Sequence, residues 1–272
     1  MQKVYTNTVV ATPDPPPKGV PNPIHDADGA SAAGYAGALV AGVRTYGWAS
    51  ESIVDALSEQ WLQDGWVDFR LPRPLFAGEP VDIEVRAGDD CWHVLCQTAD
   101  DTDTGARVVL KGTAGLGSAP WLDELQPPAP APAADAPDSL PSYDLDSVPI
   151  CQPLRPLGAY VSNDAACSMV TDDLSLPATR YRKGTLPPYF LAARMAPLTR
   201  HNFTYGPTIH ARSQIQHCAP ALTDRQVTVG AQIVDAYERN GHWYQVLDGL
   251  VTDTDGVIAR IRHHTIFRPR GT

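Results

Sequence analysis

The sequence lacks several features that would assign a protein class at once. No apolar run is long enough to span a membrane as a helix. The N-terminal stretch MQKVYTNTVVATPD has no basic start followed by an apolar segment, so we expect no secretory signal and favour a cytoplasmic protein. Lysine and arginine total 21 against 31 aspartates and glutamates, a net charge of −10. Binding to nucleic acid phosphates needs a cationic surface, so a nucleic acid partner is not expected.

Cysteine is scarce, and its spacing is uninformative. The five cysteines are Cys91, Cys96, Cys151, Cys167 and Cys218. They form no Cys-x-x-Cys pair, and the histidines show no metal-ligand spacing, so we predict buried free thiols and no metal site. The G-x-S-x-G, P-loop and Rossmann patterns are also missing, and no cofactor is expected.

Proline, in contrast, is plentiful, and it marks a boundary near the middle of the chain. Residues 126–141 read QPPAPAPAADAPDSLP, a composition that cannot build a core and favours an extended connector. The pattern predicts an N-terminal domain over 1–125, a linker over 126–141 and a C-terminal domain over 142–272. The 272 residues are enough to bury a large core in either arrangement.

The two halves repeat the same layout. Residues 91–115 and 242–267 each read as an aromatic-rich strand, an Asp/Thr/Gly turn and a second alternating strand. Upstream, residues 66–88 and 209–236 each predict a strand pair interrupted by proline. Apolar periodicity predicts one helix over 42–58 and another over 188–203, with Pro197 ending or kinking the second. One helix per curled antiparallel sheet, made twice, predicts an α+β protein with a tandem (double) hotdog fold.

The most informative stretch is PNPIHDADGASAAGYAGALVAGV, residues 21–43. Pro21 and Pro23 restrict the backbone on both sides of Asn22, so His25 is expected in a stiff loop. The small residues that follow let a ligand approach the backbone closely. Gly42 begins the predicted helix, and its amide, at the positive end of the helix dipole, suits a developing oxyanion.

These residues carry a family resemblance. NPIH followed by an acid, an alanine-rich helix, Tyr35 and the helix entry ALVAGV resembles the MaoC-like hydratase/dehydratase family, and RPLFAGEPVDIEV, residues 73–85, is similar to that family's proline-bearing strand pair. The resemblance implies hydration or dehydration of an enoyl or 3-hydroxyacyl thioester, a small-molecule substrate carried by CoA or a carrier protein. It implies that His25 is the acid/base residue and that the Gly42 amide polarises the thioester carbonyl.

The chain departs from this family at the partner of the histidine. The family has an aspartate five residues before the histidine, a position that Val20 takes in this chain. Asp26, next to His25, is the candidate catalytic partner. Asp14 and Asp28 are further acids near the loop, and for all three the alternative is a solvated acid that favours the following helix.

The substrate-binding candidates surround the loop and the two predicted helices. They are Asn22, Tyr35, Gly42, Val43, Arg44, Tyr46, Tyr181 and Tyr189. Arg44 and Tyr46 can face a cleft from the first helix, although aromatics at helical spacing are more often core. Tyr181 and Tyr189 belong to PATRYRKGTLPPYF in the second half, which has no NPxH motif and would line a cleft between the halves.

Three other functions stay open. A single acid/base residue, His25, would be enough for an isomerase or a cyclase, whose reaction needs one group to relay a proton. A hotdog thioesterase would need a carboxylate over the thioester carbonyl, for which Glu51 and Asp55 are the candidates on the helix. The third is a non-catalytic protein that binds an acyl group or another small molecule, in which Val20 at the aspartate position would reflect a lost catalytic activity. A monomer and a homodimer are both compatible with the sequence.

Overall fold

A single ten-stranded sheet organises the computed structural model, which describes residues 3–15, 22–98, 105–204 and 206–271. The strands are β1 (Val4–Val10), β2 (Gly65–Arg70), β3 (Pro80–Ala87), β4 (Trp92–Thr98), β5 (Val108–Leu116), β6 (Leu157–Tyr160), β7 (Ile209–His217), β8 (Gln226–Arg239), β9 (His242–Asp253) and β10 (Gly256–Arg268). The α-helices are α1 (Ala27–Ala32), α2 (Gly42–Leu57), α3 (Trp61–Asp64), α4 (Asn163–Ser168), α5 (Tyr189–Ala193) and α6 (Met195–Asn202). Short 3-10 turns are η1 (Pro23–His25), η2 (Leu122–Glu124) and η4 (Tyr181–Lys183), and η3 (Met169–Asp173) is a π-helical turn.

The strand order shows that the fold is duplicated. It runs β1-β3-β4-β5-β2-β7-β10-β9-β8-β6, so the second half repeats the order of the first in mirror image. The halves join where β2 pairs antiparallel with β7, with Val67 opposite Ile215. This order confirms the predicted α+β double hotdog fold. Both predicted hairpins are also present, as β4–β5 and β9–β10.

Residues 66–88 and 209–236 each form two strands as predicted, but the two strands within each segment do not pair with one another. β2 lies against β5 and β7, whereas β3 lies between β1 and β4. In the second half β7 likewise pairs with β10 and β2, and β8 pairs with β9 and β6. Alternation along a strand specifies which face is buried, but it carries no information about the neighbouring strand.

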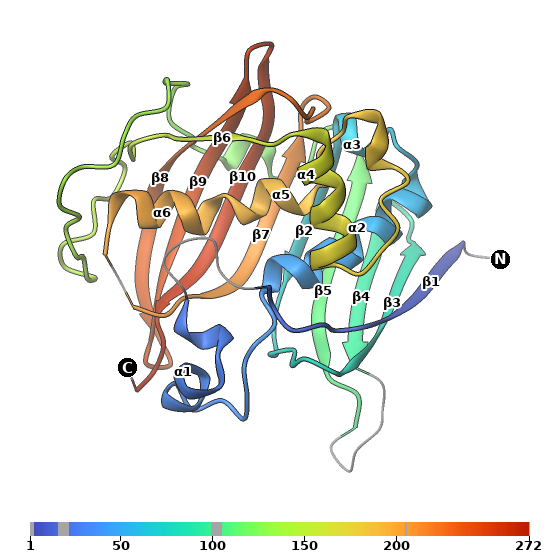
Figure 1. The fold of residues 1–272 in the computed structure, drawn as a ribbon, viewed down its shortest axis with the longest axis horizontal. Helices are drawn as coiled ribbons and strands as arrows, with labels where there is room; N and C mark the ends of the chain where they lie inside the picture. The colour runs from blue at the N-terminus through green and yellow to red at the C-terminus, as the bar shows by residue number, and fades with distance from the viewer. Residues whose placement is uncertain (1–2, 16–21, 99–104, 205, 272) are drawn as a thin grey trace.

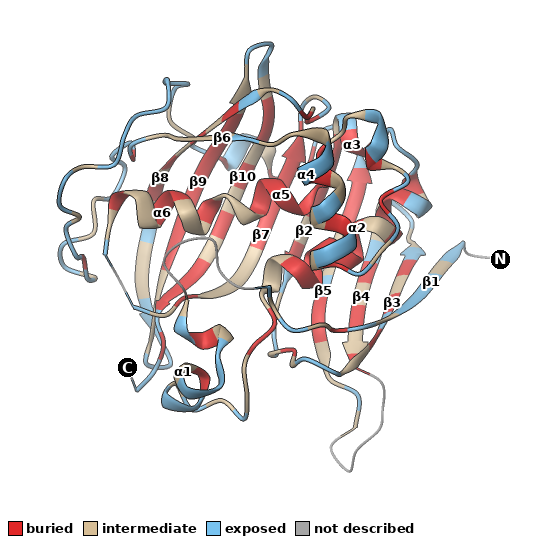
Figure 2. Cartoon of the chain, in the orientation of Figure 1, coloured by how far each residue is buried: buried red, intermediate tan, exposed pale blue. Residues whose placement is uncertain are grey.

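α2, α5 and α6 lie across one face of the sheet, whereas α1 lies below it (Figure 1). α2 begins at Gly42 as predicted and is buried along most of its length, and α5 and α6 also contain buried residues (Figure 2). The second predicted helix is divided at Arg194 into α5 and α6. In a continuous helix the ring of Pro197 would clash with the carbonyl of Ala193, and proline has no N–H to donate to that carbonyl, which explains a break at this point.

The remaining features concern the boundary and the thiols. Residues 126–141 contain no helix or strand, while the domain boundaries on either side of them stay a prediction. All five cysteines are free, but only Cys96 is buried, and Cys151 and Cys218 are exposed, contrary to the expectation that the thiols are buried. Within the described ranges, no helix has both the length and the apolar character needed to cross a bilayer.

Candidate functional site

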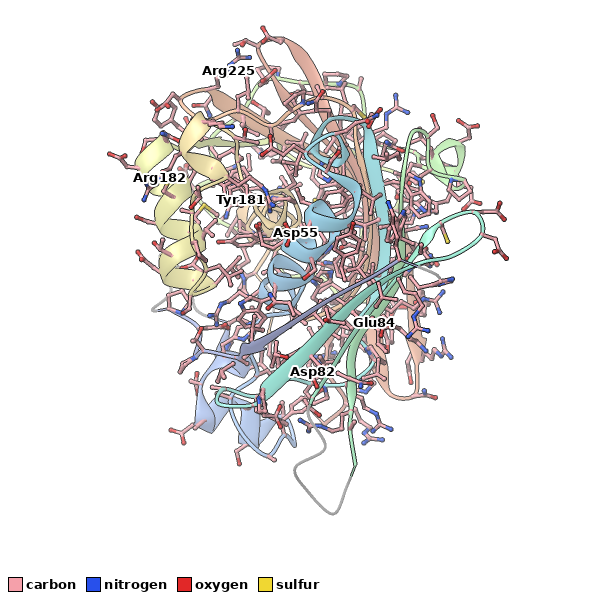
Figure 3. All side chains as sticks on the ribbon, turned by 90° about the vertical axis from the view of Figure 1, so that its right-hand side faces the viewer. Asp55, Asp82, Glu84, Tyr181, Arg182 and Arg225 are labelled. Carbon is pink, nitrogen blue, oxygen red and sulfur yellow. The ribbon has the colours of Figure 1, made fainter. Side chains whose placement is uncertain are left out.

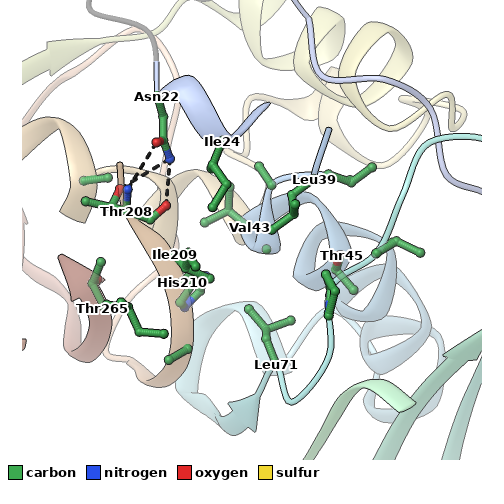
Figure 4. A pocket seen from close by; sticks show the side chains of 18 of the residues that line it. Asn22, Ile24, Leu39, Val43, Thr45, Leu71, Thr208, Ile209, His210 and Thr265 are labelled. Carbon is green, nitrogen blue, oxygen red and sulfur yellow. Dashed lines mark hydrogen bonds between the residues drawn. The ribbon is translucent and has the colours of Figure 1, made fainter. Parts of the chain in front are cut away.

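A cavity of about 410 Å³ lies where the two halves meet. The first half contributes the η1 turn and the entry to α2, and the second half contributes residues 208–211 at the start of β7 together with parts of β9 and β10. Figure 4 shows Ile24, Leu39 and Val43 on one side and Thr208, His210 and Thr265 on the other. Apolar groups form the larger part of the lining, and polar side chains from both halves interrupt it.

His25 reaches the cavity from a turn that the local sequence specifies. Pro23 occupies the first position of η1, where its missing N–H leaves no donor unsatisfied. Ile24 is buried against Leu39 and Ala30, and its carbonyl accepts the Leu39 N–H at 3.1 Å. The turn is therefore anchored by an apolar side chain while the next residue, His25, is left 27% exposed at its side chain.

The two ring nitrogens of His25 have different surroundings. Nδ1 lies 2.7 Å from the Leu39 carbonyl oxygen and 2.9 Å from Oδ2 of Asp14, and both are acceptors. Nε2 lies 3.2 Å from Nδ2 of Asn22. The network assigns the proton of a neutral ring to Nδ1 and leaves the lone pair on Nε2.

Asn22 supports this assignment because its amide cannot turn over freely. Its Nδ2 donates to the Thr208 carbonyl at 2.7 Å, and its Oδ1 accepts the Thr208 N–H at 3.2 Å (Figure 4). This reciprocal pair joins the two halves across the cavity and presents a donor, not an acceptor, to Nε2 of His25.

Asp14 connects His25 to the start of α2. Its Oδ1 accepts from Nη1 of Arg44 at 2.7 Å, and both of its carboxylate oxygens lie 3.1–3.2 Å from the Ala41 N–H. Ala41 has no side chain that can cap the helix, so a carboxylate from a distant segment takes that position, where the helix dipole favours negative charge. Arg44 is 5% exposed at its side chain and also donates to the Thr12 and Asp173 carbonyls.

The contact between Asp14 and His25 shifts the pKa of each side chain in the direction that favours its charged form. Burial opposes charging of His25, but the hydrogen bond and the negative charge of Asp14 outweigh burial and raise the pKa of the imidazole. Burial likewise disfavours ionised Asp14, but its contacts with His25, and then the hydrogen bond from Arg44, lower the pKa of the carboxyl. His25 therefore keeps a proton to a higher pH than an isolated imidazole does.

The start of α2 also faces the cavity. Gly42 and Val43 line it, and no described residue accepts a hydrogen bond from either N–H. A Cβ at Gly42 would lie 2.4 Å from Cδ1 of Leu71 and 3.2 Å from Nδ1 of His210. Only glycine fits here without movement of its neighbours.

The structure divides the predicted site residues into two groups. Those that line the cavity are Asn22, His25, Tyr35, Gly42 and Val43. Arg44 lies behind them, bound to Asp14. Asp26, proposed from the sequence as the partner of His25, is exposed and caps α1 by accepting the Gly29 N–H at 2.7 Å.

Three tyrosines lie away from the cavity lining. Tyr46 is fully buried and stacks on Phe69 with ring centroids 4.5 Å apart, so it is a core residue. The Tyr189 hydroxyl donates to the Met169 carbonyl at 2.8 Å. Tyr181 is buried between α2 and the segment that carries α4 (Figure 3).

Glu51 and Asp55 lie in the same cluster as Tyr181. Arg180 donates to Oε2 of Glu51 at 2.6 Å and to Oδ1 of Asp55 at 2.7 Å, and the Tyr181 hydroxyl donates to Glu51. Burial raises the pKa of Glu51 despite these partners. Neither carboxylate lines the cavity.

Sequence reasoning gave too little weight to Asp14 and did not identify Thr208 and His210 as cavity residues. Asp14 is one of three acids near the loop, and no local feature of the sequence distinguishes it from Asp26 and Asp28. Thr208 and His210 come from the second half, which the pairing of β2 with β7 brings to the cavity. Val20, at the family's aspartate position, lies outside the described residues. Across the described ranges, no group of three or more His, Cys, Asp or Glu side chains could hold a metal ion.

Comparison with known proteins agrees with this architecture. No protein family model and no curated protein matches the sequence. Among solved structures, a MaoC-like dehydratase has 15% identity and a TM-score of 0.56, covering 97% of each chain. A Mycobacterium tuberculosis protein described as having a double hotdog fold has 16% identity and a TM-score of 0.61, with 97% of this chain and 96% of that chain covered.

A third similar structure is an N-terminal dehydratase from the difficidin assembly line. It has 12% identity and a TM-score of 0.56, with 98% of this chain and 95% of that chain covered. Identities this low establish the fold alone. The chain is a double hotdog protein, similar in structure to MaoC-like dehydratases.

Proposed function

We propose that this protein is a hydratase or dehydratase acting on an acyl thioester, with His25 as general acid and base. The observation that carries the proposal is the orientation of His25. Its Nδ1 is held by Asp14 and the Leu39 carbonyl, while Nε2 carries the lone pair beside an apolar cavity. The N–H groups of Gly42 and Val43, which have no acceptor among the described residues, line the same cavity. The similar solved structures described as dehydratases support the choice of reaction.

One imidazole is enough for this reaction. In hydration, Nε2 of His25 accepts a proton from water as the water oxygen bonds to C3 of the enoyl group. The C2=C3 electron pair moves toward the thioester carbonyl, and the Gly42 N–H stabilises the enolate oxygen. Nε2 then returns the proton to C2, which completes a syn addition of one water, and dehydration is the reverse. Asp14 stabilises the imidazolium between the two transfers and does not itself exchange a proton.

The same base would serve migration of a double bond in an isomerase, with a proton removed from one carbon and returned to another. The arrangement favours a thioesterase less, since that reaction needs a carboxylate over the thioester carbonyl. Glu51 and Asp55 are bound by Arg180 outside the cavity, and Asp14 lies behind His25.

The test follows the conjugated enoyl absorbance of crotonyl-CoA and of the N-acetylcysteamine thioester, with product analysis for 3-hydroxyacyl and shifted-alkene products. We expect hydration by the wild type, and His25→Ala to lower the rate by about 10²–10⁴-fold with little change in melting temperature. His93→Ala, which removes an exposed histidine on β4, is the matched control and should keep the wild-type rate.

Other outcomes separate the alternatives. Alkene migration without water addition would assign an isomerase, and release of free thiol would assign a thioesterase. Saturable binding without turnover, unchanged in His25→Ala, would identify a non-catalytic binding protein and overturn the proposal.

A further inference from the structure

Two histidines of the second half form a hydrogen-bonded chain at the wall of the cavity. His210 on β7 and His263 on β10 both line it, and their ring centroids are 4.3 Å apart. Nε2 of His210 and Nδ1 of His263 each lie 2.8 Å from Oγ of Ser213, which sits between them. The three side chains belong to neighbouring strands, with Ser213 directly opposite His263 in the ladder.

The hydrogen-bonded row of His210, Ser213 and His263 leaves Nδ1 of His210 without a partner among the described residues. Nδ1 of His210 is buried and has no partner at hydrogen-bond geometry among the described residues, although the Arg212 backbone lies close to the ring. Burial lowers the pKa of His210 to about 3 and that of His263 well below its usual value, so both rings are neutral at physiological pH. A buried polar atom left unsatisfied is unfavourable, and a bound group that pairs with it removes that penalty.

The unpartnered nitrogen lies beside the start of α2. A Cβ built on Gly42 would be 3.2 Å from Nδ1 and 3.1 Å from Cβ of His210. Nδ1 of His210 therefore lies against the start of α2, where the Gly42 N–H has no acceptor among the described residues and where both residues line the cavity.

We propose that Nδ1–H of His210 is a second donor, beside the Gly42 N–H, to the carbonyl oxygen of the bound thioester. This inference rests on the proposed thioester substrate. This role needs the tautomer of His210 with its proton on Nδ1, and the contacts of His210 and His263 with Ser213 are compatible with that tautomer. In that tautomer, Nδ1–H of His263 donates to Oγ of Ser213, the Ser213 hydroxyl donates to Nε2 of His210, and the proton of the His210 ring is on Nδ1, which agrees with the two 2.8 Å contacts. A neutral imidazole is an effective donor to a developing enolate oxygen, since it polarises the carbonyl without carrying a charge that must be desolvated.

The test uses butyryl-CoA labelled with ¹³C at the thioester carbonyl, a ligand without the double bond or hydroxyl on which the proposed reaction acts. Difference infrared spectroscopy reports hydrogen bonding as a shift of the carbonyl stretch to lower frequency. We expect a shift in the wild type, a smaller one in His210→Leu, and recovery in His210→Asn, whose amide nitrogen can occupy the position of Nδ1. Calorimetry with butyryl-CoA and S-butyl-CoA, which lacks the carbonyl oxygen, should show that His210→Leu loses about fivefold of the preference for the thioester.

The outcomes distinguish this inference from the proposed function. An unchanged carbonyl stretch and an unchanged preference in His210→Leu, in a variant that melts like the wild type, overturn the role of His210 even if hydration proceeds. If the carbonyl stretching frequency depends on His210 but the protein has no hydratase activity, the role of His210 is supported and the proposed hydratase reaction is overturned. Failure to bind either butyryl-CoA or its N-acetylcysteamine counterpart overturns both.

Discussion

Oδ2 of Asp14 lies 2.9 Å from Nδ1 of His25, although the two residues are eleven positions apart in the sequence. The same carboxylate accepts hydrogen bonds from the Ala41 N–H and from Arg44. One acid therefore joins the residue proposed as the base, the start of α2 and a buried cation. This arrangement supplies a carboxylate partner for His25 from a position different from the one that the family pattern assigns.

Asp14→Asn should move the acid limb of the pH profile. The proposed base must be neutral, and its neutral form is lost as pH falls through the raised pKa of His25. Without the charge of Asp14, burial dominates and the pKa falls, so kcat/KM should persist to lower pH. The plateau should drop at least about tenfold because the ring is less well oriented.

Asp28→Asn removes the same charge from an exposed position in the neighbouring helix and should leave the profile unchanged. A profile of Asp14→Asn that coincides with that of the wild type would contradict the coupling of Asp14 and His25.

Arg44→Met should destabilise the fold. It leaves the Asp14 carboxylate, 14% exposed, without its cation and removes donors to the Thr12 and Asp173 carbonyls. We expect a loss of about 3–5 kcal/mol in the free energy of unfolding, measured in urea. In a double-mutant cycle, Asp14→Asn should cost less in the Arg44→Met background than alone. Additive losses would show that the two side chains do not interact.

Gly42→Ala should impair turnover through the entry to α2. The added Cβ would lie 2.4 Å from Cδ1 of Leu71, so the helix start or Leu71 must move. A misplacement of about 1 Å can lower kcat by about 10²-fold. Gly37→Ala is the matched control from the same loop, because its Cβ would come no closer than 3.8 Å to Phe76. Equal rates in the two variants would exclude a role for the Gly42 backbone.

Tyr46→Phe tests whether Tyr46 is a core residue or a substrate-binding residue. The Tyr46 hydroxyl is buried and has no hydrogen-bond partner among the described residues, so its removal should leave the free energy of unfolding unchanged or raise it by about 1 kcal/mol. Substrate KM should stay at the wild-type value. A raised KM would return Tyr46 to the binding surface where sequence reasoning placed it.

Buried neutral histidines should make the protein sensitive to acid. Burial lowers the pKa of His217 to about 4, while an unfolded histidine titrates near 6.5. Between these values the unfolded chain binds a proton that the native state does not, so stability falls as pH falls, by about 1.4 kcal/mol per pH unit for each such group.

His217→Phe keeps a ring against Trp61, whose centroid is 4.7 Å away, and removes one of these protons. We expect a shallower loss of stability between about pH 6.5 and pH 4, measured by urea unfolding across that range. An identical slope would show that His217 is protonated in the folded protein.

Local pattern determined much of this protein. The repeated strand–turn–strand segments, the start of α2 at Gly42 and the Pro-bearing turn that carries His25 follow from periodicity, turn residues and proline geometry, which act over a few neighbouring residues. For the same reason, the duplication and the double hotdog fold could be predicted without coordinates.

Only the tertiary structure decided what surrounds His25. Asp14 reaches His25 because the segment after β1 lies against the start of α2. Thr208 and His210 line the cavity because β2 pairs with β7. Such contacts depend on strand order and register between distant segments, and the pattern of each segment alone is compatible with several pairings. The residue types in the loop therefore indicated a site, whereas the strand order selected its members.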